Sequence, residues 1–343
     1  MTNHKILIND SKDLSKIKDK SIHLIVTSPP YPMIEMWDEI FGEDSAVIKE
    51  SLLDGDGFTA FREMHNQLKK VWAECDRVLI DGGFICINIG DATRTINKKF
   101  QLYPNHVKVV NYFYQKGYSV LPDIHWRKET NSPNKFMGSG MYPAGAYVTY
   151  EHEYILIFRK GGKREFTEEE NLRRKESAYF WEERNIWFSD LWDVKGTSQI
   201  VKESGSRDRN ASFPFEIPYR LVNMYSIKGD IVLDPFMGFG TTNLACMASN
   251  RNSIGIEIDS VIAEKALERL RNSKEYINQV IQNRIFQHNK FISSISEEKQ
   301  KNCYYNKFYD FLVKTRQEIN IKFEKIDKII QQNNIIKSSY EEE

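Results

Sequence analysis

An apolar run that ends in two consecutive prolines restricts the fold of this chain more than any other feature of its sequence. Residues 22–26 read IHLIV, and residues 27–31, which include Pro29 and Pro30, follow directly. A proline lacks an amide hydrogen and biases the residue before it towards extended geometry, so neither a ladder strand nor a helix continues through this point. We therefore predict a buried strand that stops in a stiff corner, at the strand end where open α/β sheets place their ligands.

The corner has the chemistry of a binding site for a planar molecule that carries an amino group. The carbonyls of Pro29 and Pro30 have no local partner, and Ser28 and Tyr31 add a hydroxyl and a flat ring. The prolines alone are also typical of a turn in a core loop, and Ser28 of a hydroxyl that caps the loop backbone.

A second motif combines a short strand, a glycine turn and the start of a helix. Asp234 ends the apolar stretch 231–234, and Gly238 and Gly240 let the backbone pass close to a ligand. The turn lacks the third glycine of a dinucleotide site and the lysine of a Walker loop, so a pyrophosphate fits poorly. An acid at a strand end suits a cationic amino group instead.

The residues after this turn extend the same pattern. Thr241 or Thr242 is predicted to cap a helix over residues 243–249. The strand 253–259 carries Glu257 where acids commonly bind ribose hydroxyls. A site for an amino-acid group beside a site for a ribose indicates S-adenosylmethionine.

In this order the two motifs resemble an amino-group DNA methyltransferase of the β arrangement, in which the catalytic half precedes the cofactor half. The resemblance covers roughly residues 5–272 and extends to the segments 71–83, 151–160 and 213–218, although Phe239 stands where a serine is more usual. It implies an α/β, Rossmann-like S-adenosylmethionine-dependent methyltransferase fold. That fold has a mostly parallel sheet with helices on both faces, an antiparallel edge pair, circularly permuted motif order and an inserted DNA-recognition region.

The resemblance also implies roles for individual residues. The catalytic residues would be Ser28, Pro29, Pro30 and Tyr31. The cofactor-binding residues would be Asp10, Asp234, Pro235, Phe236, Gly238, Gly240, Thr241, Thr242 and Glu257. The target base would flip out of the duplex and stack on Tyr31, while the Ser28 hydroxyl and the Pro29 carbonyl accept its amino hydrogens. The methyl group would then transfer directly, without a covalent enzyme intermediate.

Serine before the two prolines is, in this family, more often associated with cytosine N4, and an acid or asparagine with adenine N6. Ser28 therefore favours a cytosine-N4 DNA methyltransferase acting on double-stranded DNA, as the modification enzyme of a restriction–modification system. Adenine N6 is the alternative. An RNA methyltransferase and a cofactor-binding module without catalysis are further alternatives.

Composition restricts the partners. Lys+Arg and Asp+Glu both number 48, so the net charge is +0 and a DNA-binding surface must be local. Residues 1–343 contain no apolar run of membrane-spanning length. The four cysteines lack the paired spacing of a metal site, and they indicate the reduced thiols of a cytoplasmic protein. We expect a monomer or weak homodimer, together with a cognate restriction endonuclease that it need not contact.

Four regions are predicted along the chain: a catalytic half (1–159), a recognition insertion (160–212), a cofactor half (213–272) and a helical extension (273–343). Residues 32–58 are expected to form a lid, and helices are predicted over residues 59–78, 106–115 and 261–271. In the extension, Leu312, Ile319 and Ile326 recur at heptad-like spacing, as do Phe323 and Ile330, which predicts a helix with one apolar stripe.

The DNA-binding residues are expected among basic side chains of the insertion and the strand pair near residues 124–159. They are Arg127, Lys128, Lys135, Lys163, Arg164, Arg207 and Arg209. A solvated charged face is the alternative interpretation of this segment, and the loop 129–150 is the alternative recognition element.

Overall fold

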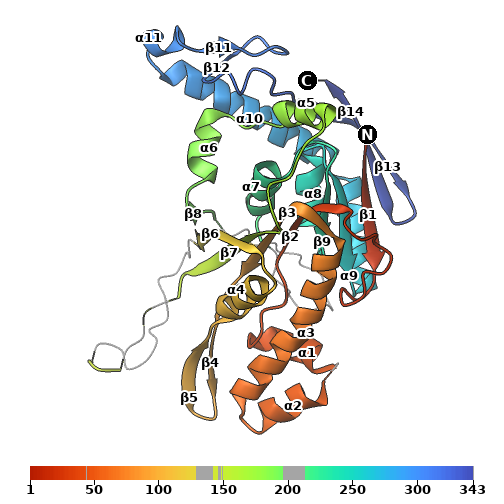
Figure 1. Ribbon diagram of the computed structural model, residues 1–343, viewed down its shortest axis with the longest axis vertical. Helices are drawn as coiled ribbons and strands as arrows, with labels where there is room; N and C mark the ends of the chain where they lie inside the picture. The colour runs from red at the N-terminus through yellow and green to blue at the C-terminus, as the bar shows by residue number, and fades with distance from the viewer. Residues whose placement is uncertain (44, 129–141, 146–147, 149, 196–212, 343) are drawn as a thin grey trace.

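The fold is organised around one long mixed sheet. The computed structural model describes residues 1–43, 45–128, 142–145, 148, 150–195 and 213–342. Within them the strands of this sheet lie side by side in the order β13 (Glu324–Gln332), β14 (Ile335–Glu342), β1 (Thr2–Ile8), β10 (Asn252–Glu257), β9 (Ile231–Asp234), β2 (Ile22–Thr27), β3 (Leu79–Ile89), β7 (His152–Arg159), β6 (Ser119–Arg127) and β8 (Leu191–Asp193) (Figure 1). Two small antiparallel pairs lie outside it, β4 (Ala92–Ile96) with β5 (Lys99–Tyr103), and β11 (Tyr304–Tyr305) with β12 (Leu312–Val313).

The central strands are parallel, which confirms the predicted fold class. β1, β10, β9, β2 and β3 pair in parallel, and β7 and β6 continue the sheet as the predicted antiparallel pair. The two halves of the permuted domain meet where β2 pairs with β9, with Leu24 opposite Val232. We call the edge at which the parallel strands end the carboxyl edge, and the opposite one the amino edge.

Helices connect the strands and cover both faces of the sheet. They are η1 (Glu35–Trp37), α1 (Asp38–Glu43), α2 (Ala46–Leu53), α3 (Gly57–Val78), α4 (Asn105–Gln115), α5 (Glu168–Glu176), α6 (Trp181–Trp187), α7 (Glu216–Tyr225), α8 (Thr241–Met247), α9 (Ser260–Arg271), α10 (Lys274–Ser294) and α11 (Glu297–Gln300). The helices predicted over 59–78, 106–115 and 261–271 are confirmed as α3, α4 and α9. The predicted lid contains η1, α1 and α2.

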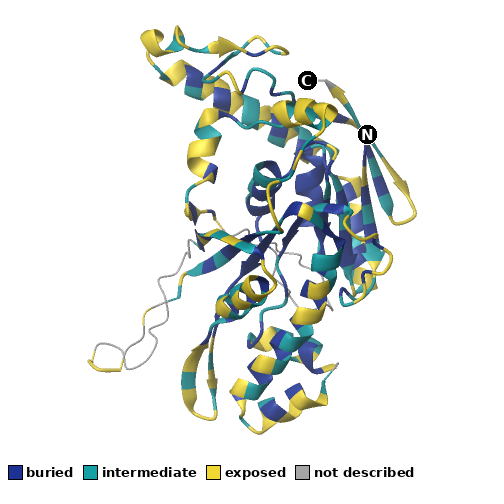
Figure 2. Ribbon diagram, viewed as in Figure 1, coloured by how far each residue is buried: buried dark blue, intermediate teal, exposed yellow. Residues whose placement is uncertain are grey.

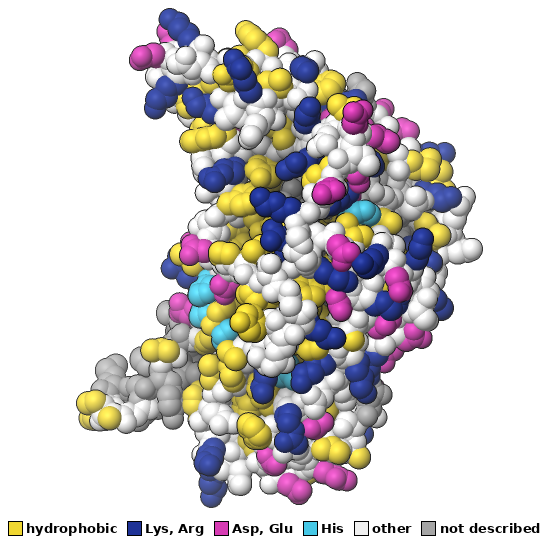
Figure 3. All heavy atoms as spheres, viewed as in Figure 1, with side chains coloured by type: hydrophobic (Ala, Val, Ile, Leu, Met, Phe, Trp, Pro, Cys, Tyr) yellow, Lys and Arg dark blue, Asp and Glu magenta, His cyan; other side chains and the backbone are white. Residues whose placement is uncertain are grey.

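Two apolar cores lie on the two faces because successive strand residues point in opposite directions. In β2, Leu24 and Val26 pack with α7, α8 and α9, whereas Ile25 packs with α3 and α4. Figure 2 shows this buried centre between more exposed outer helices. At the β6–β7 edge, histidine side chains gather at the left of the space-filling view (Figure 3).

The prediction of a helical C-terminal extension is wrong beyond residue 300. α10 and α11 are helices, but Leu312 lies in β12, and Ile326 and Ile330 lie in β13 of an antiparallel hairpin. The second strand of that hairpin pairs with β1, Thr2 opposite Ser338, so the two ends of the chain are neighbours in the sheet. A periodic run of isoleucines is compatible with either state, and pairing with β1 selects the strand.

In the described residues no helix combines the length and the apolar character that a membrane span requires.

Candidate active site

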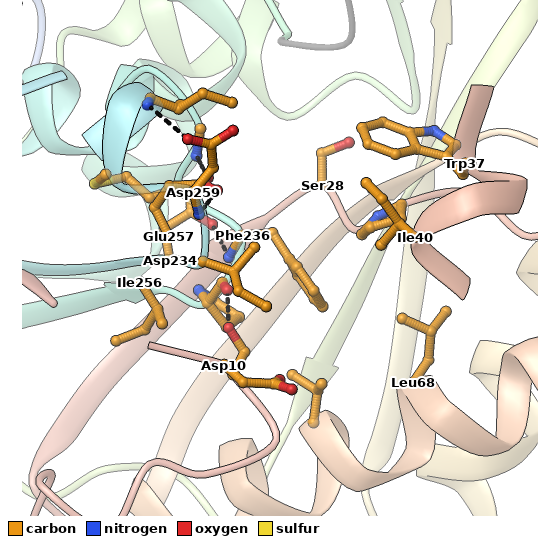
Figure 4. Close-up of a pocket in the computed structure, with 18 of the residues that line it drawn as sticks. Asp10, Ser28, Trp37, Ile40, Leu68, Asp234, Phe236, Ile256, Glu257 and Asp259 are labelled. Carbon is orange, nitrogen blue, oxygen red and sulfur yellow. Dashed lines mark hydrogen bonds between the residues drawn. The ribbon is translucent and has the colours of Figure 1, made fainter. Parts of the chain in front are cut away.

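A cavity of about 480 Å³ opens at the carboxyl edge of the parallel strands. One wall carries the ends of β9 and β10 and the start of the chain, and the other carries the β2 corner with α1 and α3 (Figure 4). The lining brings together most of the residues predicted to bind the cofactor, namely Asp10, Asp234, Pro235, Phe236, Gly238, Thr241 and Glu257. Ser28 and Pro30 of the predicted catalytic corner line the same cavity.

Asp234 is buried at the cavity and is held by three donors. Its carboxylate accepts from the Thr27 hydroxyl (2.7 Å), the Thr242 hydroxyl (2.7 Å) and the amide of Phe236 (3.0 Å). Burial outweighs these donors and raises the pKa of Asp234 to about 6. Two carboxylate oxygens offer about four acceptor positions, so one position remains for a donor in the cavity.

The glycine turn takes its shape from two residues with positive φ. Gly238 (φ +52°) and Gly240 (φ +75°) adopt the left-handed conformation. Apart from Gly238 and its two chain neighbours, no atom of the described residues lies within 4 Å of where a Gly238 side chain would begin. Glu257 accepts from the amide of Gly238 (3.1 Å) and from the amide of Asp259 (2.9 Å). The acid predicted to hold a ribose therefore also fixes the glycine turn.

The predicted threonine cap is wrong. Helix α8 begins at Thr241 with Gly240 at its N-cap position, and no side chain caps it. The Thr242 hydroxyl donates to Asp234, and the Thr241 hydroxyl accepts from Arg269 (3.1 Å). The threonines are turned to these partners because both are buried, and a buried hydroxyl needs a hydrogen bond.

The remaining cavity walls combine one acid with apolar side chains. Asp10 accepts from the amide of Lys12 (2.9 Å) and lies 3.2 Å from its Nζ. The apolar lining includes Trp37, Ile40, Phe41, Leu68, Val71, Phe236 and Ile256. A carboxylate with one remaining acceptor position, two further acids and a broad apolar wall fit the ammonium, the sugar hydroxyls and the flat ring of S-adenosylmethionine.

At the corner, Ser28 and Tyr31 belong to a polar cluster with residues of β3 and β7. The Tyr31 hydroxyl donates to Glu153 (2.9 Å), accepts from Asn88 Nδ2 (2.8 Å) and lies 3.0 Å from Ser28 Oγ. Asn88 Nδ2 also donates to Glu153 (2.7 Å). Burial, followed by the charge of Glu153, raises the pKa of Tyr31 well above its ordinary value. The phenol is therefore a fixed neutral donor.

Two features of the cluster leave acceptors unsatisfied. Asn88 Oδ1 is buried without a hydrogen-bond partner, and within the described residues no donor reaches the carbonyls of Pro29 and Pro30. A buried acceptor without a partner, such as Asn88 Oδ1, is costly, and the two proline carbonyls are also open to a donor, so a ligand that brings N–H groups to this corner would be favoured.

Sequence reasoning missed Asn88 and Glu153. Both are polar residues inside otherwise apolar strands at the carboxyl edge, and that interruption is the signal that could have identified them.

Sequence reasoning also missed the histidine and tyrosine rings near this corner. His106 stacks on Tyr154 with centroids 4.0 Å apart and lies 2.7 Å from Asp91, and His125 stacks on His152 at 5.1 Å.

The basic residues predicted to bind DNA fall into three groups. Arg127 and Lys128 lie at the carboxyl edge, where Arg127 pairs with Asp193 (2.6 Å) and Lys128 pairs with Glu153. Lys163 and Arg164 follow β7 at the amino edge. Lys135, Arg207 and Arg209 lie outside the described residues.

Comparison with known proteins gives a consistent result. Residues 22–268 match the family model of DNA methylases of the N6/N4 type. The chain is 54% identical over 325 residues to the Type II methyltransferase M.MthZI of Methanothermobacter thermautotrophicus, covering 94% of this chain and 90% of the relative. It is 49% identical over 283 residues to the Type II methyltransferase M.MjaI of Methanocaldococcus jannaschii, covering 77% and 91%.

Solved structures show the same fold. TTHA0409 of Thermus thermophilus, solved in complex with S-adenosyl-L-methionine, superimposes with a TM-score of 0.60 at 29% identity, covering 78% of this chain and 92% of that one. The cytosine-N4-specific PvuII DNA methyltransferase gives a TM-score of 0.55 at 19% identity, covering 82% and 92%.

Proposed function

Since this chain belongs to the N6/N4 DNA methylase family and is an S-adenosylmethionine-dependent DNA methyltransferase, we propose that it methylates the exocyclic N4 of cytosine in double-stranded DNA. The observation that carries this proposal is Ser28, a short hydroxyl in front of Pro29 and Pro30 that lines the same cavity as the predicted cofactor-binding residues. A target base inside a duplex cannot reach that cavity, so it must first flip out of the stack.

The hydrogen-bond directions around Tyr31 make Ser28 an acceptor for the base. The Tyr31 hydroxyl gives its proton to Glu153, so in the 3.0 Å contact with Ser28 the serine is the donor. The lone pairs of Ser28 then remain for an amino hydrogen, and the carbonyl of Pro29 takes the second. Both acceptors would hold the amino hydrogens and favour a pyramidal nitrogen, whose lone pair can form the new N–C bond as the sulfonium C–S bond breaks. The amino nitrogen would then lose one proton to solvent. Fixed acceptors of this kind favour transfer by positioning.

Glu153 and Asn88 act as positioning residues. Glu153 accepts from Tyr31, Asn88 and Lys128, and it is 8% exposed. These contacts fix the Tyr31 ring against Gly90, where a side chain would begin 3.1 Å from the ring. The ring is thereby held as the surface on which the flipped base stacks.

The residues of the cavity are assigned to S-adenosylmethionine. S-adenosylmethionine, when bound, supplies the activated methyl group. We assign the ammonium to Asp234 and the turn at Gly238, the ribose to Glu257, and the adenine to the apolar wall near Asp10 and Phe236. The cavity joins these residues to Ser28, so the methyl donor and the amino acceptor share one space.

The target DNA is assigned to the carboxyl edge, since Ser28 lies there. Arg127 and Lys128 end β6 at this edge, and we propose that they lie near the phosphates that flank the flipped base. The names of M.MthZI and M.MjaI as Type II methyltransferases support a role as the modification enzyme of a restriction–modification system.

Nucleoside analysis tests the choice of base. Unmethylated duplex DNA is incubated with the enzyme and S-adenosylmethionine, digested, and examined by liquid chromatography and mass spectrometry, with RNA in a parallel arm. We expect N4-methylcytosine in DNA. N6-methyladenine in DNA would overturn the assignment of the base and leave the methyltransferase assignment intact.

Replacement of Ser28 tests its role. Ser28→Ala removes one fixed acceptor from the amino group, so we expect the rate of methyl transfer in a single turnover to fall about tenfold to a thousandfold. Binding of S-adenosylmethionine should remain near that of the wild type. Ser15→Ala, at an exposed serine, is the matched control. A single-turnover rate equal to the control would show that Ser28 is a structural hydroxyl.

A further inference from the structure

A second and larger cavity lies at the amino edge, at the opposite ends of the strands from the catalytic corner. Its volume is about 1110 Å³, and α5, α6, α7 and the segment 315–320 surround the sheet edge there. The pairing register of β3 and β7 shows where the cavity lies. Phe84 and Arg159 are paired at this cavity, whereas Ile89 and Tyr154 are paired at the other end of the same strands.

Positive charge dominates the lining. Six basic side chains line the cavity without a carboxylate partner in the described part of the chain: Arg159, Lys163, Arg174, Lys175, Arg184 and Arg316. Figure 3 shows Lys and Arg side chains gathered in this region of the molecule, where α5, α6 and α7 lie. Because the chain has a net charge of +0, such a local excess is a surface feature rather than a consequence of composition.

The two acids in the lining neutralise only a small part of this charge. Asp230 pairs with Arg164 at 2.7 Å. Glu318 accepts from the amide of Trp181 (2.8 Å) and from the Thr315 hydroxyl (2.6 Å). Glu318 offsets only part of the charge of the six cations, so the lining keeps an excess of positive charge and the cavity attracts an anion.

One guanidinium has a buried donor that is unused. Nε of Arg159 is buried and has no hydrogen-bond partner within the described residues. An unsatisfied buried donor on a charged group is costly, and an oxyanion in the cavity would satisfy it.

Aromatic rings stand among the cations. The guanidinium of Arg174 lies 4.8 Å from the centroid of the Phe166 ring, and that of Arg164 lies 4.7 Å from it. Trp181 and Phe188 of the α6 region line the cavity and are 41% and 43% exposed. Unpaired cations interleaved with accessible rings are typical of sites that hold phosphates and stack bases.

We propose that the amino-edge cavity is a second nucleic-acid site, which binds the phosphates and bases of an unpaired strand away from the catalytic corner. Its volume of about 1110 Å³ suits a few nucleotide units rather than a stretch of duplex. The chemistry required is that of nucleotides with phosphate groups, and either a strand or free nucleotides could supply it.

Binding of a fluorescein-labelled dodecathymidylate, dT12, tests this inference on the full chain in the presence of S-adenosylhomocysteine. Thymine has no exocyclic amino group, so dT12 is no substrate for the catalytic corner. The test variant is Arg174→Glu with Lys175→Glu on α5, and the matched control is Lys69→Glu with Lys70→Glu, two adjacent exposed lysines on α3. Lys163→Glu, at an exposed loop position, is the second test variant.

We expect the α5 double variant to bind dT12 at least about tenfold more weakly and to lower the salt slope by about 1.4, because two phosphate contacts on a single strand are lost. Lys163→Glu should show a smaller loss, and the α3 control should bind as the wild type does. Equal binding by the wild type and both test variants would overturn the proposal.

Two further arms identify the source of the ligand and separate this site from the catalytic one. Displacement of labelled dT12 by unlabelled dT12 but not by ATP would identify a strand, whereas displacement by ATP at similar concentration would identify free nucleotides. Methylation of a short duplex by the α5 double variant should equal that of the wild type. Loss of that methylation with folding intact would place the α5 cations in the target-DNA site and would overturn a separate second site.

Discussion

At the residue scale, the Asp234 carboxylate lies at the cavity of the candidate active site and connects two segments of the fold. Its carboxylate accepts from Thr27 on β2 and from Thr242 on α8, two segments more than 200 residues apart in the chain. Replacement by alanine would leave both buried hydroxyls without their acceptor, at about 1–3 kcal/mol each. A change that keeps the shape, Asp234→Asn, separates charge from structure.

We expect cofactor binding to depend on pH through Asp234. Its pKa of about 6 lies above its ordinary value of 3.8, so the folded protein holds a proton that the unfolded chain has lost, and this contribution to stability falls as the pH rises from about 4 to 6. A ligand ammonium favours the ionised carboxylate. Binding should therefore release protons below pH 6, and affinity should rise with pH until about 6 and then level off.

Titration calorimetry of S-adenosylmethionine in two buffers of different ionisation enthalpy, at pH 5.5, measures this release. Asp234→Asn should bind more weakly and release no proton from this site. Identical proton release by the wild type and the variant would show that Asp234 does not face the ammonium.

At the scale of elements, the ion pairs of Arg164 connect α5 to the segment before β9. Its guanidinium pairs with Glu170 (2.8 Å) in the capping box of that helix and with Asp230 (2.7 Å) before β9, and Asp230 is 4% exposed. Its neighbour Lys163 is exposed and has no ion pair within the described residues. Two adjacent basic residues, both predicted to bind DNA, thus have different surroundings.

We expect Arg164→Ala to lower the free energy of unfolding by about 3 kcal/mol, because it leaves Asp230 buried without its main cation. Lys163→Ala should change it by less than about 0.5 kcal/mol. Urea unfolding followed by circular dichroism compares the two variants. Equal midpoints would mean that the Arg164 ion pairs contribute nothing to stability.

At the scale of the whole molecule, the C-terminal hairpin extends the sheet beyond β1 and is part of the fold. Tyr340 donates to the carbonyl of Met247 (3.1 Å) and lies 2.7 Å from the Thr2 hydroxyl. Ile326 is fully buried in the core that contains α8 and α9, whereas Ile330, after a bulge in β13, is 41% exposed. In a helix the two residues, four apart, would share one face.

Alanine at these two positions distinguishes the hairpin from a helix with an apolar stripe. We expect Ile326→Ala to destabilise the whole protein by about 2–4 kcal/mol and Ile330→Ala by less than about 0.5 kcal/mol. Thermal unfolding with and without S-adenosylmethionine gives both values. Similar losses at the two positions would contradict the hairpin register.

Local sequence patterns were sufficient to predict the central elements and several residues that line the cavity at the carboxyl edge. Asp10, Asp234 and Glu257 are recognisable because each ends an apolar stretch, and the glycine turn follows Asp234 directly. Such patterns depend on residues close together in the chain, and strands that end at the same edge necessarily bring their last residues together. The parallel sheet and the helices α3, α4 and α9 followed from the same local periodicity.

Contacts between residues that are distant in the chain could be found only in the folded structure. Glu153 meets Tyr31 across 122 residues, and Arg164 meets Asp230 across 66. The C-terminal segment forms a hairpin because its second strand pairs with the edge of β1. The predicted DNA-binding residues lie at two different edges of the sheet because β6 and β7 run in opposite directions. Ion pairs and strand pairing release their free energy only after distant segments meet, so local sequence does not encode them.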